Sequence, residues 1–420
     1  MNLFSKFVNR LGLVGTPRPG FPPTAPRPSP IFVDPDNIEE QITPQYCAQR
    51  FYPVRLGEVI NDKYHIVSKL GFGTSSTVWL AWDVQRKWWQ TQQWVTIKML
   101  TRSASGKSTA ETELEVSRLV LQANPLCEGR QYLRTVIDSF EVTGPHGLHT
   151  GLVYETMRES LKTFQRRHRE RRISESLLKA LLEPVLHGLD YLHSECNIIH
   201  TDLKPDNILL GVESRHAIEE VVQAEIDEPT PYKVEDDRAI YCSRNFGCLR
   251  GIPGKPKLSD FGLAVRGDEL PLHFHPIQPN RYQAPEVILG LGWTYSADVW
   301  NLGVMLWDMI ENTSLFDAET AEGDYSVQRH LEEMSFLLGP PPEDMVNRGD
   351  IAPRYFSSEG GEILQHNCEP ARGASLEASL TAFSGEGKPQ YLRFVRRMLQ
   401  WRPEDRATAR ELLKDPWLAR

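Results

Sequence analysis

The polar segment His200-Thr201-Asp202-Leu203-Lys204-Pro205-Asp206-Asn207 carries the residue types best suited to chemistry in this chain. The carboxylate of Asp202 can orient a hydroxyl group and accept its proton. Asn207 offers an oxygen ligand to a hard cation such as Mg²⁺, and Lys204 can stabilise a phosphoryl group during transfer. A polar surface loop is the alternative interpretation, but this many residue types in this order favour a chemical role.

A second acidic motif, Asp260-Phe261-Gly262, follows the apolar Leu258. Its carboxylate could bridge Mg²⁺ to phosphates, while Phe261 packs inward and Gly262 allows a turn. Further along the chain is Ala284-Pro285-Glu286. We expect Glu286 to form an ion pair with Arg406, and we expect that pair to be structural and not catalytic.

Two candidate phosphate-binding features precede these motifs. The loop Gly71-Phe72-Gly73-Thr74-Ser75-Ser76-Thr77-Val78 could bring backbone N–H groups close to phosphate oxygens, although a plain hairpin often has this pattern. Lys98 ends the strand pattern Val95-Thr96-Ile97, where a lysine is usually a solvated surface charge. An ion pair with Glu113, or with Glu115 as the fallback, would direct its ammonium group toward phosphate.

Strands and helices must position these groups. Strand patterns occur at 64–67, 77–80 and 94–97, and a helix is predicted over 111–121. From Ser174 onward helical periodicity dominates, and it recurs over 296–310 and 389–400. The sequence therefore predicts an α+β protein with a small strand-rich unit followed by a larger helical unit.

Composition along the chain predicts the domain boundaries. Residues 1–50 form a proline-rich tail predicted to be disordered, and order should begin near Phe51. The strand-rich domain spans 51–157 and the helical domain 158–420. Two polar, proline- and glycine-containing stretches, at about 211–256 and 312–388, are interpreted as insertions on the helical domain, with a helical run around 330–338 in the second.

In chain order, the glycine-rich loop, strand lysine, helix glutamate, His-x-Asp loop, Asp-Phe-Gly and Ala-Pro-Glu resemble the motifs of a eukaryotic protein kinase. The resemblance covers about residues 57–418, and Asp202-Leu203-Lys204-Pro205-x-Asn207 is similar to the serine/threonine branch. Finer features resemble the SR-protein kinases, especially in their fungal form. They are Tyr52 to Glu58, Ser76 to Leu80, His200-Thr201-Asp202, the insertion between Asn207 and Asp260, and the segments Leu315-Phe316-Asp317, Asp324-Tyr325, His330-Leu331 and Leu337-Leu338-Gly339.

The resemblance implies a two-lobed fold and ATP-dependent phosphorylation of serine, typically in Arg-Ser repeats of splicing factors. It also implies roles for the motif residues. Asp202 and Lys204 would be catalytic with Lys98 and Glu113, while Asn207 and Asp260 would bind Mg²⁺. The ATP-binding residues would be Leu70, Gly71, Phe72, Gly73, Thr74, Ser75, Ser76, Val78, Lys98, Glu155 and Met157.

Regulation and substrate choice can also be inferred from the sequence. No serine or threonine lies between Asp260 and Glu286, and Thr201 stands beside the catalytic aspartate where kinases switched by loop phosphorylation have arginine. We therefore predict activity without loop phosphorylation. The acidic residues Asp317, Glu319, Glu322 and Asp324 could bind an arginine-rich substrate or could form a solvated loop.

Composition excludes several classes of protein. The formal net charge of −9 argues against nucleic-acid binding through bulk charge. No apolar run approaches the ~18 residues needed to cross a bilayer. The cysteines are sparse and scattered, as in an intracellular protein with reduced thiols. We expect a monomer whose partner is its protein substrate, and the resemblance to the SR-protein kinases implies that it shuttles between cytoplasm and nucleus.

Three alternatives remain open. Residues 1–30 contain basic residues, no acid and apolar residues at helical spacing, so an organellar transit peptide is the alternative to a simple tail. The chain could be a kinase-like scaffold that acts by binding, although such proteins usually lose Lys98, Asp202 or Asp260. It could also be a related kinase with substrates other than splicing factors.

Overall fold

The computed structural model describes residues 36–86, 94–102, 109–235, 238–320, 323–349, 351–357, 363–364 and 375–419. The chain divides into two compact units. The first comprises Met1–Ala104, Ile137–Thr156 and Val212–Ile252, and the second comprises Ser105–Val136, Met157–Gly211 and Pro253–Arg420. Among the described residues, no helix is long and apolar enough to span a membrane.

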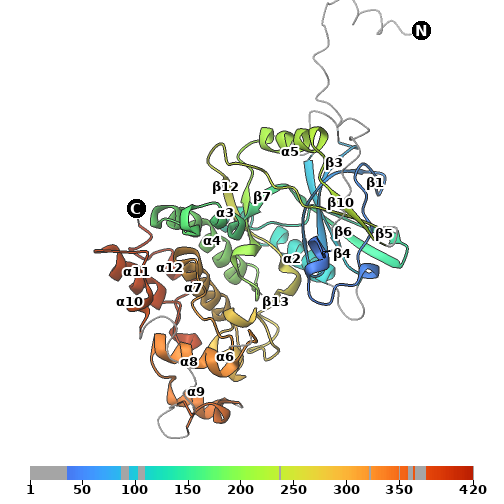
Figure 1. Cartoon of the computed structure of the whole chain (residues 1–420). Coiled ribbons are helices and arrows are strands. Elements are labelled where there is room, and N and C mark those ends of the chain that lie inside the picture. Colours follow the sequence, from blue (N-terminus) through green and yellow to red (C-terminus); the bar gives the residue numbers. More distant parts are fainter. Residues whose placement is uncertain are drawn as a thin grey trace, which may run out of the picture. The chain divides into compact units, whose positions relative to one another are not determined.

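The first unit is built on a six-stranded antiparallel sheet with the order β1-β2-β3-β4-β6-β5 (Figure 1). The strands predicted over 64–67, 77–80 and 94–97 are confirmed as parts of β2, β3 and β4. The strands are β1 (Val59–Ile60), β2 (Tyr64–Gly73), β3 (Ser76–Asp83), β4 (Trp94–Leu100), β5 (Asp138–Gly144) and β6 (Gly147–Glu155).

The register of this sheet places several predicted ATP-binding residues in one row. Gly71 on β2 pairs with Val78 on β3, Val78 pairs with Lys98 on β4, and Lys98 pairs with Leu152 on β6. Directly paired residues point to the same face of a sheet. The intervening residues, such as Ile97, belong to the buried core of the opposite face. The pleat therefore presents Val78 and Lys98 on one face of the sheet.

The insertion after strand β9 (Ile208–Gly211) belongs to the first unit, which differs from the predicted domain boundaries. It forms helix α5 (Arg215–Asp227) and the hairpin β10 (Tyr232–Glu235) and β11 (Arg238–Tyr241). Ile218, Val221 and Val222 of α5 pack on Leu80 of β3, whereas Tyr241 joins the core of the other face. The insertion is polar overall, so the short apolar stripe of α5 was not detected in the sequence. This stripe is buried against the sheet.

The segment before Phe51 is also structured, so the prediction that order begins near Phe51 is wrong for residues 36–50. This segment forms two 3-10 helices, η1 (Glu39–Ile42) and η2 (Ala48–Arg50). Glu40 and Gln41 are buried. The sequence reads as a polar tail because its buried charges find partners only in distant parts of the chain.

The second unit is mostly helical, as predicted (Figure 1). Its helix α2 (Thr109–Gln122) matches the helix predicted over 111–121, although it belongs to this unit and not to the strand-rich one. The other helices are α3 (Leu161–Arg166), α4 (Glu175–Ser194), α6 (Pro285–Leu289), α7 (Ser296–Glu311), α8 (Val327–Leu338), α9 (Glu343–Arg348), α10 (Leu376–Ser379), α11 (Gly387–Arg396) and α12 (Ala409–Leu412).

Helices α4 and α7 supply much of the core of the second unit. The apolar row predicted along α4 is confirmed, because residues such as Leu178, Leu181, Leu182 and Leu189 are buried. Helix α7 is buried from Ala297 to its end at Glu311, so protein surrounds nearly all of it. A helix buried in this way is rigid, so its polar side chains are held in fixed positions against the loops that contact it.

Short strands position the catalytic motifs within the second unit. A three-stranded sheet has the order β12 (Gly254–Leu258), β9 (Ile208–Gly211) and β7 (Met157–Ser160), and a second pair joins β8 (Ile198–Ile199) to β13 (Val265–Arg266). Ile208 pairs with Leu258. Because the pairing is antiparallel, the loop before β9 and the loop after β12 meet at the same edge of the sheet.

Candidate active site

The carboxylate of Asp202 is held by two neighbouring side chains of its own loop. Lys204 donates from Nζ to Oδ2 at 2.7 Å and to Oδ1 at 2.9 Å. Asn207 donates from Nδ2 to Oδ2 and to the backbone carbonyl of Asp202, both at 2.8 Å. These hydrogen bonds fix the orientation of the carboxylate within the loop. The arrangement suits a group that accepts a proton.

Asn207 and Asp260 are brought to one edge of the small sheet. The backbone N–H and the hydroxyl of Ser259 both donate to the carbonyl of Asn207, at 2.9 Å. Asp260 is the next residue along the chain. The amide nitrogen of Asn207 is occupied by Asp202, and no described donor binds its Oδ1. The side-chain amide oxygen Oδ1 of Asn207 and the carboxylate of Asp260 are therefore suitable ligands for a hard divalent cation.

Asp298, at the start of α7, is a functional residue that sequence reasoning missed. It is fully buried, and its carboxylate accepts hydrogen bonds from the backbone N–H groups of His200 at 2.7 Å and Thr201 at 2.8 Å. Burial raises the pKa of Asp298, but the hydrogen bond and charge of His193, together with the charge and backbone N–H of His200, keep the pKa below its ordinary value. The available signal was the Ser-Ala-Asp-Val-Trp segment after Ala-Pro-Glu.

This anchor maintains a strained backbone. Thr201 adopts a left-handed conformation with φ of 67°, which is rare for a β-branched residue. Its N–H is held by Asp298 and its hydroxyl donates to the carbonyl of Leu263 at 2.8 Å. Strain of this kind persists only where the surroundings fix it. Asp298 therefore sets the direction in which the loop presents Asp202.

The Asp-Phe-Gly motif is also in an unusual conformation. Asp260, not the glycine, has the left-handed backbone, with φ of 66°. Phe261 is buried as predicted, and its ring lies 5.3 Å from that of His200. A Cβ atom on Gly262 would lie 3.3 Å from Oε1 of Glu113 on α2. Gly262 lies in the 3-10 turn η6 (Phe261–Leu263), as predicted, and its lack of a side chain also leaves room for α2.

The predicted ATP-binding loop forms the β2–β3 hairpin of the first unit. A Cβ on Gly71 would meet nothing within 4 Å, and one on Gly73 would meet only Oγ of Ser76 at 3.8 Å. Neither glycine has a positive φ. The backbone does not require glycine here, so the open space above the loop fits the close approach of phosphate groups.

The other predicted ATP-binding residues are distributed over both units. Lys98 and Glu155 belong to the first unit, whereas Glu113 and Met157 belong to the second. The Lys98–Glu113 ion pair therefore stays a prediction. Leu70 packs against the cluster that includes α5. The hydroxyl of Thr96, beside Lys98, donates to Thr156 at 3.4 Å, so it has a partner within the first unit.

Comparison with known proteins agrees with this geometry. The model of the protein kinase domain matches residues 64–418. The chain belongs to the protein kinase family.

Three relatives and one solved structure show how far the similarity extends. A serine/threonine protein kinase of Aspergillus fumigatus is 39% identical over 94% of this chain and 95% of its own. The kinase SRPK of Physarum polycephalum is 32% identical, covering 91% and 92%. SRSF protein kinase 3 of Sus scrofa is 24% identical, covering 94% of each chain. The crystal structure of a kinase domain aligns with a TM-score of 0.66 at 21% identity, covering 88% of this chain and 99% of that one.

The chain is thus an ATP-dependent serine/threonine protein kinase with the two-lobed kinase fold. Kinases of this family use ATP with a divalent metal ion. The residues that fit the metal and the phosphates are those described above. The SR-protein kinase resemblance of the sequence is matched by relatives named SRPK and SRSF protein kinase 3.

The segment before Ala284-Pro285-Glu286 is fixed on α7 of this kinase. The hydroxyl of Tyr282 donates to Oδ2 of Asp308 at 2.7 Å. Burial raises the pKa of Asp308 to about 6 and also raises that of Tyr282. Asn301 donates to the carbonyl of Tyr282 at 2.9 Å. These contacts hold the end of the segment in place with no phosphate group.

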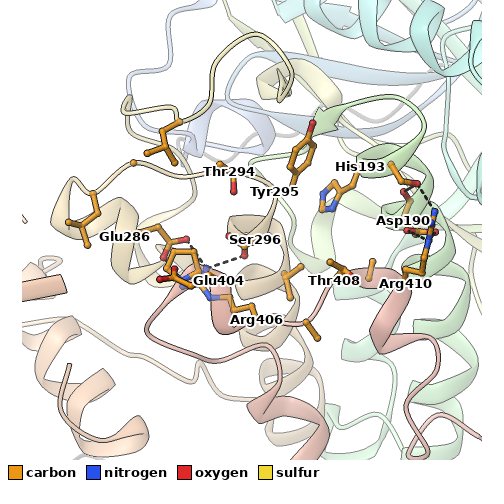
Figure 2. A pocket seen from close by; sticks show the side chains of 18 of the residues that line it. Asp190, His193, Glu286, Thr294, Tyr295, Ser296, Glu404, Arg406, Thr408 and Arg410 are labelled. Atoms are coloured by element: carbon orange, nitrogen blue, oxygen red, sulfur yellow. Dashed lines mark hydrogen bonds and ion pairs between the residues drawn. The ribbon is translucent and has the colours of Figure 1, made fainter. Parts of the chain in front are cut away.

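The predicted ion pair between Glu286 and Arg406 is confirmed. Both side chains are fully buried, and two N–H groups of Arg406 donate to the two carboxylate oxygens at 2.7 and 2.6 Å. The pair lies at one side of a cavity of about 650 Å³ within the second unit (Figure 2). The exposed pair Arg410–Asp190 lies at the other side. None of the proposed catalytic or metal-binding residues lines this cavity.

Because Thr201 is committed to hydrogen bonds, this kinase should not need loop phosphorylation. Residues 260–286 include no serine or threonine that could be phosphorylated. At position 201, where an arginine would bind such a phosphate, this kinase has the buried Thr201 instead. We expect recombinant enzyme to keep its initial rate after phosphatase treatment and removal of the phosphatase. A sample treated with heat-killed phosphatase is the control, and a large loss confined to the active phosphatase would contradict the prediction.

Proposed function

We propose that this kinase transfers the γ-phosphoryl group of ATP to serine residues of Arg/Ser-rich proteins such as splicing factors. Asp202 aligns the serine hydroxyl and accepts its proton, and Lys204 stabilises the charge on the phosphoryl group. Asn207 and Asp260 hold Mg²⁺, which neutralises phosphate charge when bound. Lys98 binds the α- and β-phosphates. The observation that carries the chemical assignment is the joined hydrogen-bond network of Asp202, Lys204 and Asn207.

The substrate class is supported by the names of the relatives. Proteins named SRPK and SRSF protein kinase 3 match more than nine-tenths of this chain. Acidic residues after α7 provide negative charge that could bind substrate arginines. We propose further that the enzyme acts as a monomer and shuttles between cytoplasm and nucleus, with targeting to an organelle by residues 1–30 as the alternative.

One feature of the acidic residues favours a second candidate, a related kinase with substrates other than Arg/Ser-rich proteins. The guanidinium of Arg281, three residues after Gln278, forms ion pairs with Glu319 and with Asp317, the latter at 3.4 Å, and donates to Ser314 at 3.1 Å. Glu322 lies outside the described residues. Arg281, which lies between the Asp-Phe-Gly and Ala-Pro-Glu motifs, thus neutralises part of the negative charge to which a basic substrate would bind.

A peptide comparison tests the substrate proposal. We expect a higher kcat/KM for peptides with Arg-Ser repeats than for Ser-Pro peptides of equal length. Replacing Arg281 with glutamine should lower KM for the Arg-Ser peptides several-fold, because Asp317 and Glu319 would no longer be paired within the chain and could pair with substrate arginines. Breaking such exposed pairs costs about 1 kcal/mol. Arg266→Gln, which removes another exposed guanidinium paired with Asp268, is the matched control. A preference for Ser-Pro peptides would favour the second candidate.

A further inference from the structure

The strand that leads into the glycine-rich loop carries a buried lysine that the proposed chemistry does not use. The side chain of Lys69 on β2 is 0% exposed. Its ammonium group donates to the carboxylate of Glu40 and to the carbonyl of Tyr241 at 3.0 Å, and it lies 3.2 Å from Oε2 of Glu39. It also lies 5.5 Å from the ring centre of Phe72, inside the glycine-rich loop. Lys69 thus links this loop to distant parts of the first unit.

A second buried cation continues the network. Arg238 on β11 lies 3.1 Å from Oε1 of Glu40 and donates to the carbonyls of Ala48 and Phe51 at 3.1 and 2.9 Å. Gln41 donates to Glu235 on β10 at 2.5 Å. The segment 36–51 and the hairpin β10–β11 therefore hold each other, and Glu40 lies between the two cations.

Backbone contacts fix β2 within this network. Arg244 donates its N–H to the carbonyl of Lys69 at 2.8 Å. Glu39 accepts hydrogen bonds from the N–H and the hydroxyl of Ser243, at 2.9 and 2.6 Å, and adopts a left-handed backbone with φ of 53°. Such strain is retained only where the surroundings impose it. Two segments far from β2 in sequence thus converge on the residue that precedes Leu70 and Gly71.

Stability alone does not account for three buried charges, those of Glu40, Lys69 and Arg238, beside the partly exposed Glu39. Removing two charges from water costs about as much as their attraction returns, so apolar residues of similar volume would stabilise the unit as well or better. The network instead fixes one strand in one position. That strand is the one whose end forms the glycine-rich loop.

We propose that Glu40, Lys69 and Arg238 form a clamp that positions the glycine-rich strand for ATP. In this clamp, residues 36–50 and the hairpin β10–β11 are integral parts of the nucleotide-binding unit, and Glu40 is its central positioning residue. The inference rests on the proposed assignment of the glycine-rich loop to ATP. It predicts that disturbing the clamp weakens nucleotide binding without altering the binding of the peptide substrate.

Calorimetric titration of the full-length protein with Mg·ADP, together with separate KM values for ATP and peptide, tests the clamp. The substitution Glu40→Gln removes the carboxylate that contacts both Lys69 and Arg238. The carboxylate of Glu39 then remains in the network with these two cations. We expect Kd for Mg·ADP and KM for ATP to rise about tenfold, as for the loss of one charged hydrogen bond, with the peptide KM unchanged.

Glu141→Gln, which changes an exposed glutamate on β5 of the same unit, is the matched control and should bind Mg·ADP like the wild type. If Glu40→Gln does not fold, Glu39→Gln at the partly exposed side of the clamp gives the same readout. A lower melting temperature with an unchanged Kd would overturn the proposal, because the network would then be purely structural. Failure of the wild type to bind Mg·ADP would instead remove the proposed function on which the clamp rests.

Discussion

Replacing Asp202 with asparagine should lower kcat by roughly 10²–10⁴-fold, the contribution expected of a positioned general base. Asparagine has the same shape and can still accept a hydrogen bond from Lys204, so the loop should keep its conformation. What it loses is the ability to take the proton of the attacking hydroxyl and the charge that orients that group. Initial rates at saturating ATP and peptide, measured on protein with an unchanged circular dichroism spectrum, report this effect.

Asp206→Asn provides the matched control for this loss. It makes the same chemical change four residues away in the same loop, at an exposed side chain to which we assign no role in proton transfer. Its kcat should remain close to that of the wild type. Comparable kcat values for Asp202→Asn and the wild type would show that another group accepts the proton, and the assignment of Asp202 would be wrong.

Replacing Arg406 with leucine should lower the free energy of unfolding by about 3–5 kcal/mol, the range for breaking a buried ion pair on one side. The variant leaves the carboxylate of Glu286 buried and unpaired. It also removes hydrogen bonds to the carbonyls of Ser296, Gln400 and Trp401, and the packing of the guanidinium on Trp300 at 5.0 Å. Denaturant midpoints followed by tryptophan fluorescence measure the change.

The exposed pair on the other side of the cavity serves as the comparison. Arg410→Leu breaks an ion pair whose arginine is 56% exposed, and such pairs contribute about 0–1 kcal/mol. The double variant Glu286→Gln/Arg406→Met should be less destabilised than Arg406→Leu, because no buried charge remains alone. Equal destabilisation by Arg406→Leu and Arg410→Leu would contradict the view that burial decides the strength of the first pair.

Local sequence patterns were sufficient where the physical cause is local. The strands β3 and β4 follow from runs of β-branched, aromatic and other apolar residues, and the apolar row of α4 follows from helical periodicity. The motif that contains Asp202, Lys204 and Asn207 folds back on itself within five residues, so its hydrogen bonds could be anticipated from spacing alone. The Glu286–Arg406 pair was predictable only because both residues lie in recognisable motifs.

Only the tertiary structure decided which unit the insertion and the segment before Phe51 belong to. Lys69 looks like a surface lysine on a strand, and Glu40 looks like part of a polar tail. They meet across 29 residues of sequence, and Glu40 meets Arg238 across 198. Charges buried by distant segments leave no local pattern, because each becomes tolerable only when its partner arrives. The sequence determined the elements and the catalytic motifs, whereas long-range burial decided how Asp298 and the clamp residues support them.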